Sequence, residues 1–357
     1  MHKYTQLMVG PTAIPDRVLH AMNRQIISHR SPEFCKIQEN VTKNLKKLFG
    51  TKNDVFTLTC SGTGAMETAI QNCFSPGDKV VGVVTGNFGE RISTVAETFG
   101  LNVTRVKFEL GETADVNKVM EYVDADTKGV LVIHNESSTG VFNDLKSFGE
   151  ALKDTNAILV VDSISGMGGV EVKMDEWHID VLFTSSQKAL MTPPGVSFIS
   201  LSEKAWNAVE NSKNPKFYFD LKRAKEYYSI NQTPWTCPVQ TIYGVEEALN
   251  MIFEEGLDNV IKRHNKNANL VREGVKELGF SLLVKDENYA SPTLTAVKAP
   301  GKSKVIVKAL AEEGVIIGGG LKPLSDDIFR VGTMGYVSEN DIAVFLYALK
   351  KIVKKLN

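Results

Sequence analysis

Short apolar runs alternate with stretches of helical length from about residue 50 to residue 200 of this 357-residue chain. Seven runs have the length and the Val, Ile and Leu content of buried strands: VFTLTC, KVVGVVTG, NVTRVKF, VLVIHN, ILVVD, VLFTSS and VSFIS. Runs this apolar are typical of strands covered on both faces of a parallel sheet. The pattern therefore predicts an α/β fold whose large domain has a mostly parallel seven-stranded sheet flanked by helices.

The pattern changes after residue 200. Between about 203 and 238 it is irregular and aromatic, and then IYGVEEALNMIFEEG and NVIKRHNKNANLVREGVKELG predict two long helices. From about residue 280, SPTLTAVKAP, VIIGGG and IFRVGTMG predict strands, and SKVIVKALAEEG predicts a helix. The final helix is expected to begin at Ser338, where Asp341 completes a capping box. We interpret this region as a small α+β domain. The predicted division is an N-terminal arm (1–15), a large domain (16–255) and a small C-terminal domain (256–357).

Composition and charge narrow the class of protein. Hydrophobic residues make up 43% of the chain, and the net charge of −1 argues against a nucleic-acid surface, which would be basic. The opening MHKYTQLMVG does not resemble a signal peptide, and no apolar run reaches membrane length. The four cysteines show no CxxC spacing and the six histidines no HxxxH pair, so we expect neither disulfides nor a metal site. These features predict a soluble cytoplasmic protein that binds neither nucleic acid nor membrane.

Two of the predicted strands lead to residues with complementary chemistry. ILVVD ends on Asp162, and Lys188 follows the run VLFTSS. Strands of a parallel sheet end at the crevice where ligands bind, so a carboxylate and an amine are expected at the same rim. Pyridoxal phosphate chemistry uses such a pair, because a lysine forms the Schiff base while a carboxylate keeps the pyridinium nitrogen protonated. Either residue alone would more often be a surface lysine or a turn cap, and their joint occurrence favours the catalytic interpretation.

The segment SGTG lies between a predicted strand and a predicted helix, where free N–H groups and the helix dipole suit a phosphate. Thr63 adds a hydroxyl. GTGAME lacks the third glycine of the dinucleotide fingerprint, which weakens a dehydrogenase interpretation. AVKAPGKS has Ala296 where a P-loop requires glycine, which weakens an NTPase interpretation.

Three more segments contain candidate ligand contacts. Phe88, in GNFGER, could stack on an aromatic ligand or belong to the core. Arg330, amid apolar residues in IFRVGTMG, needs an anionic partner, either a substrate carboxylate or a structural ion pair. The run VLVIHNESSTG brings a polar cluster to a strand end, where it is either a ligand contact or only a turn. That cluster comprises His134, Asn135, Glu136, Ser138 and Thr139.

Taken in order, the motifs of this chain resemble those of the class V, fold-type I pyridoxal phosphate-dependent aminotransferases, and most closely the serine–pyruvate/alanine–glyoxylate branch. The resemblance spans nearly the whole chain and rests on GPT (10–12), HRSPEF (29–34), SGTGAME, GNFGER, HNESSTGV, VVDSISGMGG, SSQKAL, PWTCPVQTIYGVEEAL and RVGTMG. It implies pyridoxal 5′-phosphate (PLP) as cofactor and amino transfer between alanine or serine and glyoxylate or pyruvate, with ping-pong kinetics. It also implies a homodimer whose active site is shared between subunits.

The resemblance implies a role for each matching residue. Lys188 would be the Schiff-base lysine and proton shuttle, and Asp162 the partner of the pyridinium nitrogen. Arg330 would bind the substrate carboxylate, with the backbone of Gly10 nearby. The remaining cofactor contacts would be Thr63, Gly64 and Ala65 at the phosphate, Phe88 over the ring, Ser138 on the ring-hydroxyl side, Gln187 at the phosphate, and Thr236 from the neighbouring subunit. Two positions depart from the alanine–glyoxylate members: Thr233 replaces a tyrosine that reaches the partner's phosphate, and Ala65 replaces a frequent histidine.

Three alternative functions stay open. An aspartate aminotransferase needs a second arginine in the pocket, and Arg30, Arg91 or Arg223 could supply it. A cysteine desulfurase or related lyase shares the fold and the Asp–Lys pair but needs a late cysteine, and none follows Cys237. From another class, a non-catalytic binding protein could use this fold, although the presence of the lysine, the aspartate and Arg330 argues against it.

Overall fold

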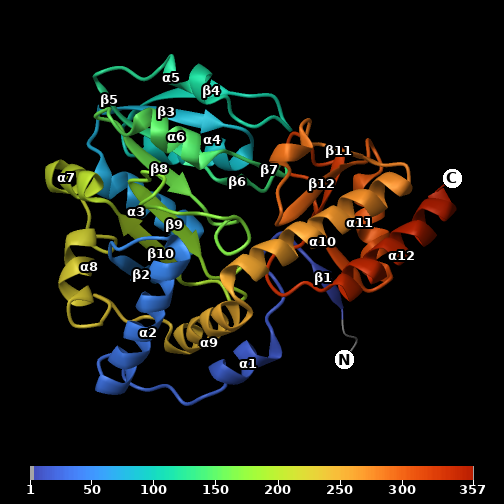
Figure 1. Cartoon of the computed structure of the whole chain (residues 1–357), viewed down its shortest axis with the longest axis horizontal. Helices are drawn as coiled ribbons and strands as arrows, with labels where there is room; N and C mark the ends of the chain where they lie inside the picture. The colour runs from blue at the N-terminus through green and yellow to red at the C-terminus, as the bar shows by residue number, and fades with distance from the viewer. Residues whose placement is uncertain (1–3, 357) are drawn as a thin grey trace.

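The larger of two sheets in the computed structural model, which describes residues 4–356, has seven strands in the order β2-β10-β9-β8-β5-β3-β4 (Figure 1). β10 runs antiparallel to both of its neighbours, and the other pairs are parallel. All seven predicted strands are therefore confirmed, as is the mostly parallel sheet. Their bounds are β2 (Val55–Leu58), β3 (Lys79–Val84), β4 (Asn102–Lys107), β5 (Thr127–Ile133), β8 (Ile158–Asp162), β9 (Val181–Ser185) and β10 (Ser197–Leu201).

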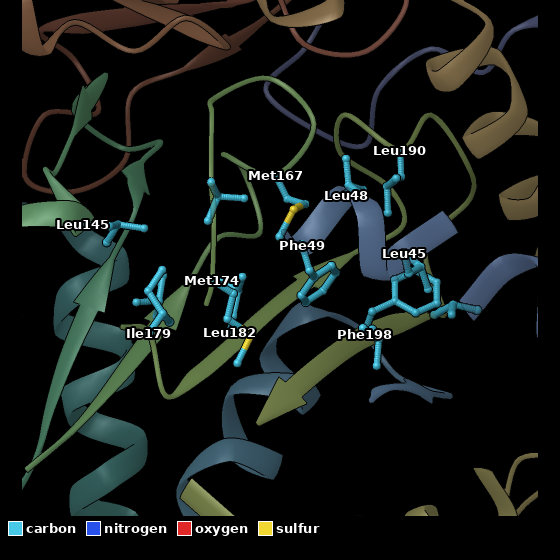
Figure 2. Close-up of a cluster of buried hydrophobic side chains, with 14 of the residues drawn as sticks. Leu45, Leu48, Phe49, Leu145, Met167, Met174, Ile179, Leu182, Leu190 and Phe198 are labelled. Atoms are coloured by element: carbon cyan, nitrogen blue, oxygen red, sulfur yellow. The ribbon is translucent and has the colours of Figure 1, made fainter. Parts of the chain in front are cut away.

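Helices cover both faces of this sheet, so alternate residues of each strand enter opposite hydrophobic clusters. Val130 and Val132 of β5 lie in one cluster and Leu131 and Ile133 in the other. The first cluster, part of which Figure 2 shows, also receives the apolar face of α2, for example Leu45. Burying one such side chain contributes roughly 1.5–3 kcal/mol. The helices of the first cluster are α1 (Asp16–Met22), α2 (Pro32–Phe49), α5 (Val116–Met120), α6 (Leu145–Leu152) and α9 (Val239–Glu255), and those of the second are α3 (Gly62–Cys73), α4 (Asn87–Thr98), α7 (Glu203–Asn211) and α8 (Leu221–Tyr228).

The region between about 203 and 238, whose pattern is irregular, contains the short helices α7 and α8. Ser202 caps α7 by accepting a hydrogen bond from Ala205 N (3.2 Å), and Asp220 caps α8 by accepting one from Lys222 N (2.9 Å). The two helices have only 9 and 8 residues, and each buries two of them, so the helical pattern is short and is interrupted by the aromatic residues between the helices.

The second sheet combines C-terminal strands with one N-terminal strand, in the order β1-β13-β14-β12-β11. β1 pairs in parallel with β13, with Thr5 opposite Val315. The predicted strands, helix and capping box of this region are confirmed, and Ser338 N donates to Asp341 Oδ2 at 2.9 Å. The bounds are β1 (Thr5–Leu7), β11 (Ser281–Leu282), β12 (Leu294–Lys298), β13 (Val315–Gly319) and β14 (Ile328–Gly332), with α10 (Leu257–Glu277), α11 (Ser303–Glu312) and α12 (Glu339–Leu356) packed against them and η1 (Glu287–Tyr289) before β12.

The three-part division of the chain stays a prediction. Residues 1–3 of the predicted arm lie outside the described residues, and the strand that follows them joins the sheet of the C-terminal part. Among residues 4–356, no helix combines the length and the apolar character that a membrane span requires.

Candidate active site

A cavity of about 230 Å³ opens at the ends of strands β5, β8 and β9. Five of the residues predicted to be catalytic or to bind the cofactor line it: Thr63, Phe88, Asp162, Gln187 and Lys188. Two further candidates from the sequence, Asn135 and Arg91, line it as well. The other lining residues are Ser61, Gly62, Met66, Ile133, Ser137, Ile164 and Ser165. The structure thus brings the predicted lysine, carboxylate, aromatic ring and helix start to one enclosed space.

Lys188 is held in the cavity by the N-terminal segment. Its Nζ donates to Val9 O (2.5 Å), and its own carbonyl accepts from Thr12 Oγ1 (2.9 Å). Gly10 has a φ of +118°, and a Cβ placed there would lie 2.5 Å from Lys188 Nζ. Burial, reinforced by the positive charge of Arg330, lowers the pKa of Lys188 to about 8. The amine is therefore partly neutral near physiological pH, as a general base must be.

Asp162 is buried at the end of β8, with 3% of its surface exposed. Its Oδ1 accepts from Ile164 N at 2.8 Å. Burial raises the pKa of Asp162 to about 7, although Lys188 and Arg91 oppose the shift. Among the ion pairs of residues 4–356, none joins Asp162 to Lys188. A cationic ring nitrogen placed against this carboxylate would keep it ionised and would be stabilised by it.

The start of α3, which the sequence predicts to bind phosphate, lines one part of the cavity. The N–H groups of Gly64 and Ala65 both bond to Ser61 O (2.9 and 3.3 Å). Those of Gly62 and Thr63 have no acceptor within the described part of the chain, and both residues line the cavity. Free N–H groups at a helix N-terminus bind phosphate well. Gly62, which the sequence analysis did not single out, joins Thr63 here, while the roles of Gly64 and Ala65 stay predictions.

Glu136 lies on β6 (Asn135–Glu136), which pairs with β7 (Val141–Phe142). It fixes the start of α4, the part of the cavity wall that carries Phe88. Its fully buried carboxylate accepts from Phe88 N (3.0 Å) and Gly89 N (3.1 Å) at the start of α4. The other oxygen accepts from Ser138 N (3.0 Å) and Ser138 Oγ (2.5 Å). Four donors satisfy this acid, although burial raises its pKa. The sequence placed Glu136 in a polar cluster but did not indicate that it orients the aromatic residue.

Ser137, not Ser138, lines the cavity. The hydroxyl of Ser138 donates to Glu136 and accepts from Asn87 N (2.9 Å), so both of its hydrogen-bonding functions serve the wall itself. Contact between Ser138 and the ring hydroxyl of a cofactor stays a prediction.

Asn135 provides an independent test of whether a polar ligand fits this cavity. Its amide nitrogen donates to Ser165 Oγ and Thr293 Oγ1, both at 3.0 Å. Its Oδ1 is buried and has no hydrogen-bond partner among residues 4–356. A buried polar atom in this state is costly and is normally satisfied by a ligand or water. The free N–H groups of α3, the aromatic Phe88, Asp162 and Lys188 complete a set that fits PLP.

Arg330, Thr233 and Thr236 do not line this cavity. Arg330, 9% exposed, donates from Nε to Gly319 O (2.8 Å) and from Nη1 to Ser137 O (2.9 Å), so its partners are carbonyl oxygens. Thr233 is buried and donates to Trp235 O (2.7 Å), whereas Thr236 is exposed. The predicted contacts of these residues with substrate or with the partner's cofactor stay predictions.

The fold and the cavity together define a PLP-dependent enzyme with a lysine and an aspartate at the cofactor site. The chain belongs to the class-V aminotransferase family, whose profile matches residues 7–345. It is therefore an aminotransferase, and its cofactor is pyridoxal phosphate.

Similar proteins indicate to which branch of the family the chain belongs. An uncharacterized aminotransferase of Methanocaldococcus jannaschii is 39% identical, over 98% of this chain and 92% of its own length. A serine–glyoxylate aminotransferase of Methylorubrum extorquens is 35% identical, over 92% of this chain and 86% of its own. The crystal structure of an alanine–glyoxylate aminotransferase from a Nostoc species superposes with a TM-score of 0.94 at 30% identity, covering 99% and 96% of the two chains. The predicted serine–pyruvate/alanine–glyoxylate branch is thus confirmed.

Proposed function

We propose that this aminotransferase moves an amino group from a small amino acid, alanine or serine, to a small 2-oxo acid, glyoxylate or pyruvate. The observation that carries the proposal is the partly buried amine of Lys188 in one small cavity with the buried carboxylate of Asp162. Relatives named as serine–, alanine– and L-aspartate–glyoxylate aminotransferases support the substrate class.

PLP, when bound, supplies an electron sink for the charge left on the substrate Cα. Asp162 holds a proton on the ring nitrogen and so maintains that sink. Lys188 Nζ would hold the cofactor at rest and, when an amino acid has displaced it, would accept the Cα proton of the substrate. The lowered pKa of Lys188 favours this step, because the amine is available in its neutral form. The same amine returns a proton at the end of the half-reaction.

Arg330 is the proposed holder of the substrate carboxylate. Its Nε and Nη1 are fixed by Gly319 O and Ser137 O, which orients the guanidinium plane before substrate arrives. No acceptor within residues 4–356 takes the hydrogens of Nη2, so this nitrogen of the guanidinium is available to bind an anion. Each substrate would bind in turn, which gives ping-pong kinetics.

Exposed aromatic residues around Thr236 support a homodimer. Phe217 is 71% exposed and Tyr218 45% exposed, and both stack on Trp235, next to Thr236. Large exposed apolar groups of this kind commonly mark protein–protein contacts. We propose that this surface meets a second copy of the chain and presents Thr236 to its cofactor. Sedimentation equilibrium should give twice the chain mass, and a monomer that retains full activity would contradict the shared site.

A desulfurase function has less support. Cys60 lies against Gly64 at the start of α3, but burial raises the pKa of its thiol to about 12. Such a thiol is almost entirely protonated at neutral pH and is a poor nucleophile.

The decisive experiment removes the amine of Lys188. Lys188→Ala should abolish the visible absorbance of lysine-bound cofactor and nearly all transfer from alanine to glyoxylate. Lys204→Ala is a matched control, since Lys204 Nζ also donates to a backbone carbonyl, Ala157 O (2.6 Å), at the opposite end of β8. Wild-type protein given an amino acid alone should release one 2-oxo acid per site. Full turnover in Lys188→Ala would refute the proposal.

A further inference from the structure

The structure separates three arginines that the sequence left as equal candidates for a second substrate carboxylate. Arg30 is occupied, because its guanidinium donates to Gln232 Oε1 (2.7 Å), Thr233 O (2.6 Å) and Pro234 O (2.9 Å). Arg223 stacks on aromatic rings away from the cavity. Arg91 is the one of the three that lines the cavity with Lys188 and Asp162.

The guanidinium of Arg91 is positioned without being neutralised. It lies over the ring of Phe88, 4.7 Å from the centroid, one helical turn further along α4. A cation held against an aromatic face keeps its hydrogen-bond donors available at its edge. Within residues 4–356, no carboxylate lies within ion-pair distance of Arg91, and no acceptor takes its hydrogens.

The acidic residues of the same helix are committed elsewhere. Glu90 pairs with Arg105 (2.9 Å) and Lys107 (2.5 Å), and Glu97 is bound to Arg105 as well. Both acids therefore face β4 and leave Arg91 without a partner on its own helix. This arrangement preserves a positive charge at the cavity wall.

Arg91 is also close enough to act on both catalytic groups. Its charge lowers the pKa of Asp162 and contributes to lowering that of Lys188. A substrate that replaces Lys188 on the cofactor would occupy the cavity that Arg91 lines, while Arg330 is available for the α-carboxylate. Arg91 lines the cavity, and Arg330 lies behind its wall, bonded to the carbonyl of the lining residue Ser137 (2.9 Å). Two separate guanidinium groups suit an anion with two carboxylates.

We infer that Arg91 binds the side-chain carboxylate of a dicarboxylic substrate, so that the enzyme accepts aspartate besides alanine or serine. The inference rests on the proposed function and extends its substrate class. Arg91→Gln would leave a polar amide at this position but remove the positive charge, the paired N–H donors and the reach of the guanidinium.

The experiment compares L-aspartate and L-alanine as donors to glyoxylate in the PLP-loaded protein. Arg91→Gln should lower kcat/KM for aspartate roughly 10- to 100-fold, as expected for losing a charged hydrogen-bonded contact, and change that for alanine less than about threefold. Arg91→Lys should recover part of the aspartate activity. Arg24→Gln is the control, because Arg24 also stacks on an aromatic ring, at 4.0 Å from the centroid of Tyr243, but does not line the cavity.

Each outcome decides one question. Equal losses for both donors in Arg91→Gln would mean that Arg91 serves the α-carboxylate or the cofactor, and would overturn the inference. So would unchanged aspartate activity, or wild-type protein that uses alanine but not aspartate. Wild-type protein that binds PLP but transfers from neither of these donors, nor from serine, would instead overturn the proposed function.

Discussion

Gly10 lies against the Lys188 amine, so a side chain at this position tests how that amine is held. A Cβ on Gly10 would lie 2.5 Å from Lys188 Nζ, 2.7 Å from Cδ and 2.8 Å from Cε. All three distances are far inside van der Waals contact. The φ of +118° is also unfavourable for any residue with a side chain. Gly10→Ala must therefore displace the lysine from Val9 O and strain the backbone.

The two costs change different measured quantities, one the PLP affinity and the other the free energy of unfolding. Crowding of the lysine by the added Cβ, which pushes Nζ away from where it would meet the cofactor, costs about 1–3 kcal/mol, equivalent to roughly 5- to 150-fold in PLP affinity. Backbone strain costs about 1–3 kcal/mol of unfolding free energy. Gly77→Ala is the control, since Gly77 has a φ of +88° but no neighbour within 4 Å of the added Cβ. It should lose stability without losing cofactor affinity.

The assay is a PLP titration followed by the visible absorbance of the lysine-bound cofactor, together with kcat and urea unfolding. Gly10→Ala should lose affinity and stability, whereas Gly77→Ala should lose only stability. Wild-type affinity and kcat in Gly10→Ala would refute the reasoning about the lysine. An equal loss of affinity in Gly77→Ala would assign the effect to the backbone alone.

Substitutions at three other residues test the buried acid, the cavity wall and the site shared between subunits. Burial raises the Asp162 pKa from 3.8 to about 7. Between these values the folded protein binds more protons than the unfolded chain, so stability falls as pH rises. Asp162→Asn should therefore abolish transfer yet stabilise cofactor-free protein, by at most roughly 4 kcal/mol above pH 7 and far less at pH 4 in urea unfolding; a gain independent of pH would contradict this. Glu136→Ala should cost at least about 3 kcal/mol of unfolding free energy, because buried donors lose their acceptor, and Glu136→Gln less; equal costs would argue against the hydrogen bonds. Thr236→Val should raise the PLP dissociation constant roughly 2- to 10-fold by equilibrium dialysis, and an unchanged constant would contradict a site shared between subunits.

The large sheet could be predicted because its strands are buried on both faces and read as continuous apolar runs. Residues 130–133 show the reason, since neighbours in the run enter different clusters and none can be polar. α7 and α8 escaped prediction because each is only about two turns long and lies beside an aromatic segment that breaks the pattern. The pairing of β1 with β13 joins opposite ends of the chain, and no local pattern reports a contact of that range.

The residues of the site likewise include some that the sequence could predict and some that it could not. Lys188 and Asp162 were predictable because strand ends and residue chemistry agree at both positions. The choice of Ser137 over Ser138, and of Arg91 over Arg30 and Arg223, depends on which way a side chain points and on what has already bound it. Those facts arise only from the packed wall that Glu136 organises.

The parallel pairing of β1 with β13 makes the N-terminal segment a direct link between the C-terminal sheet and Lys188. β1 ends at Leu7 on the edge of the C-terminal sheet, and Val9, whose carbonyl holds the Lys188 amine, follows after a single intervening residue. Nothing in so short a connection can absorb a displacement of that sheet. Any movement of the C-terminal sheet relative to the large sheet therefore also moves Val9 O, the acceptor that holds the Lys188 amine. The reactivity of Lys188 thus depends on the position of a sheet that contributes none of its strands to the cofactor cavity.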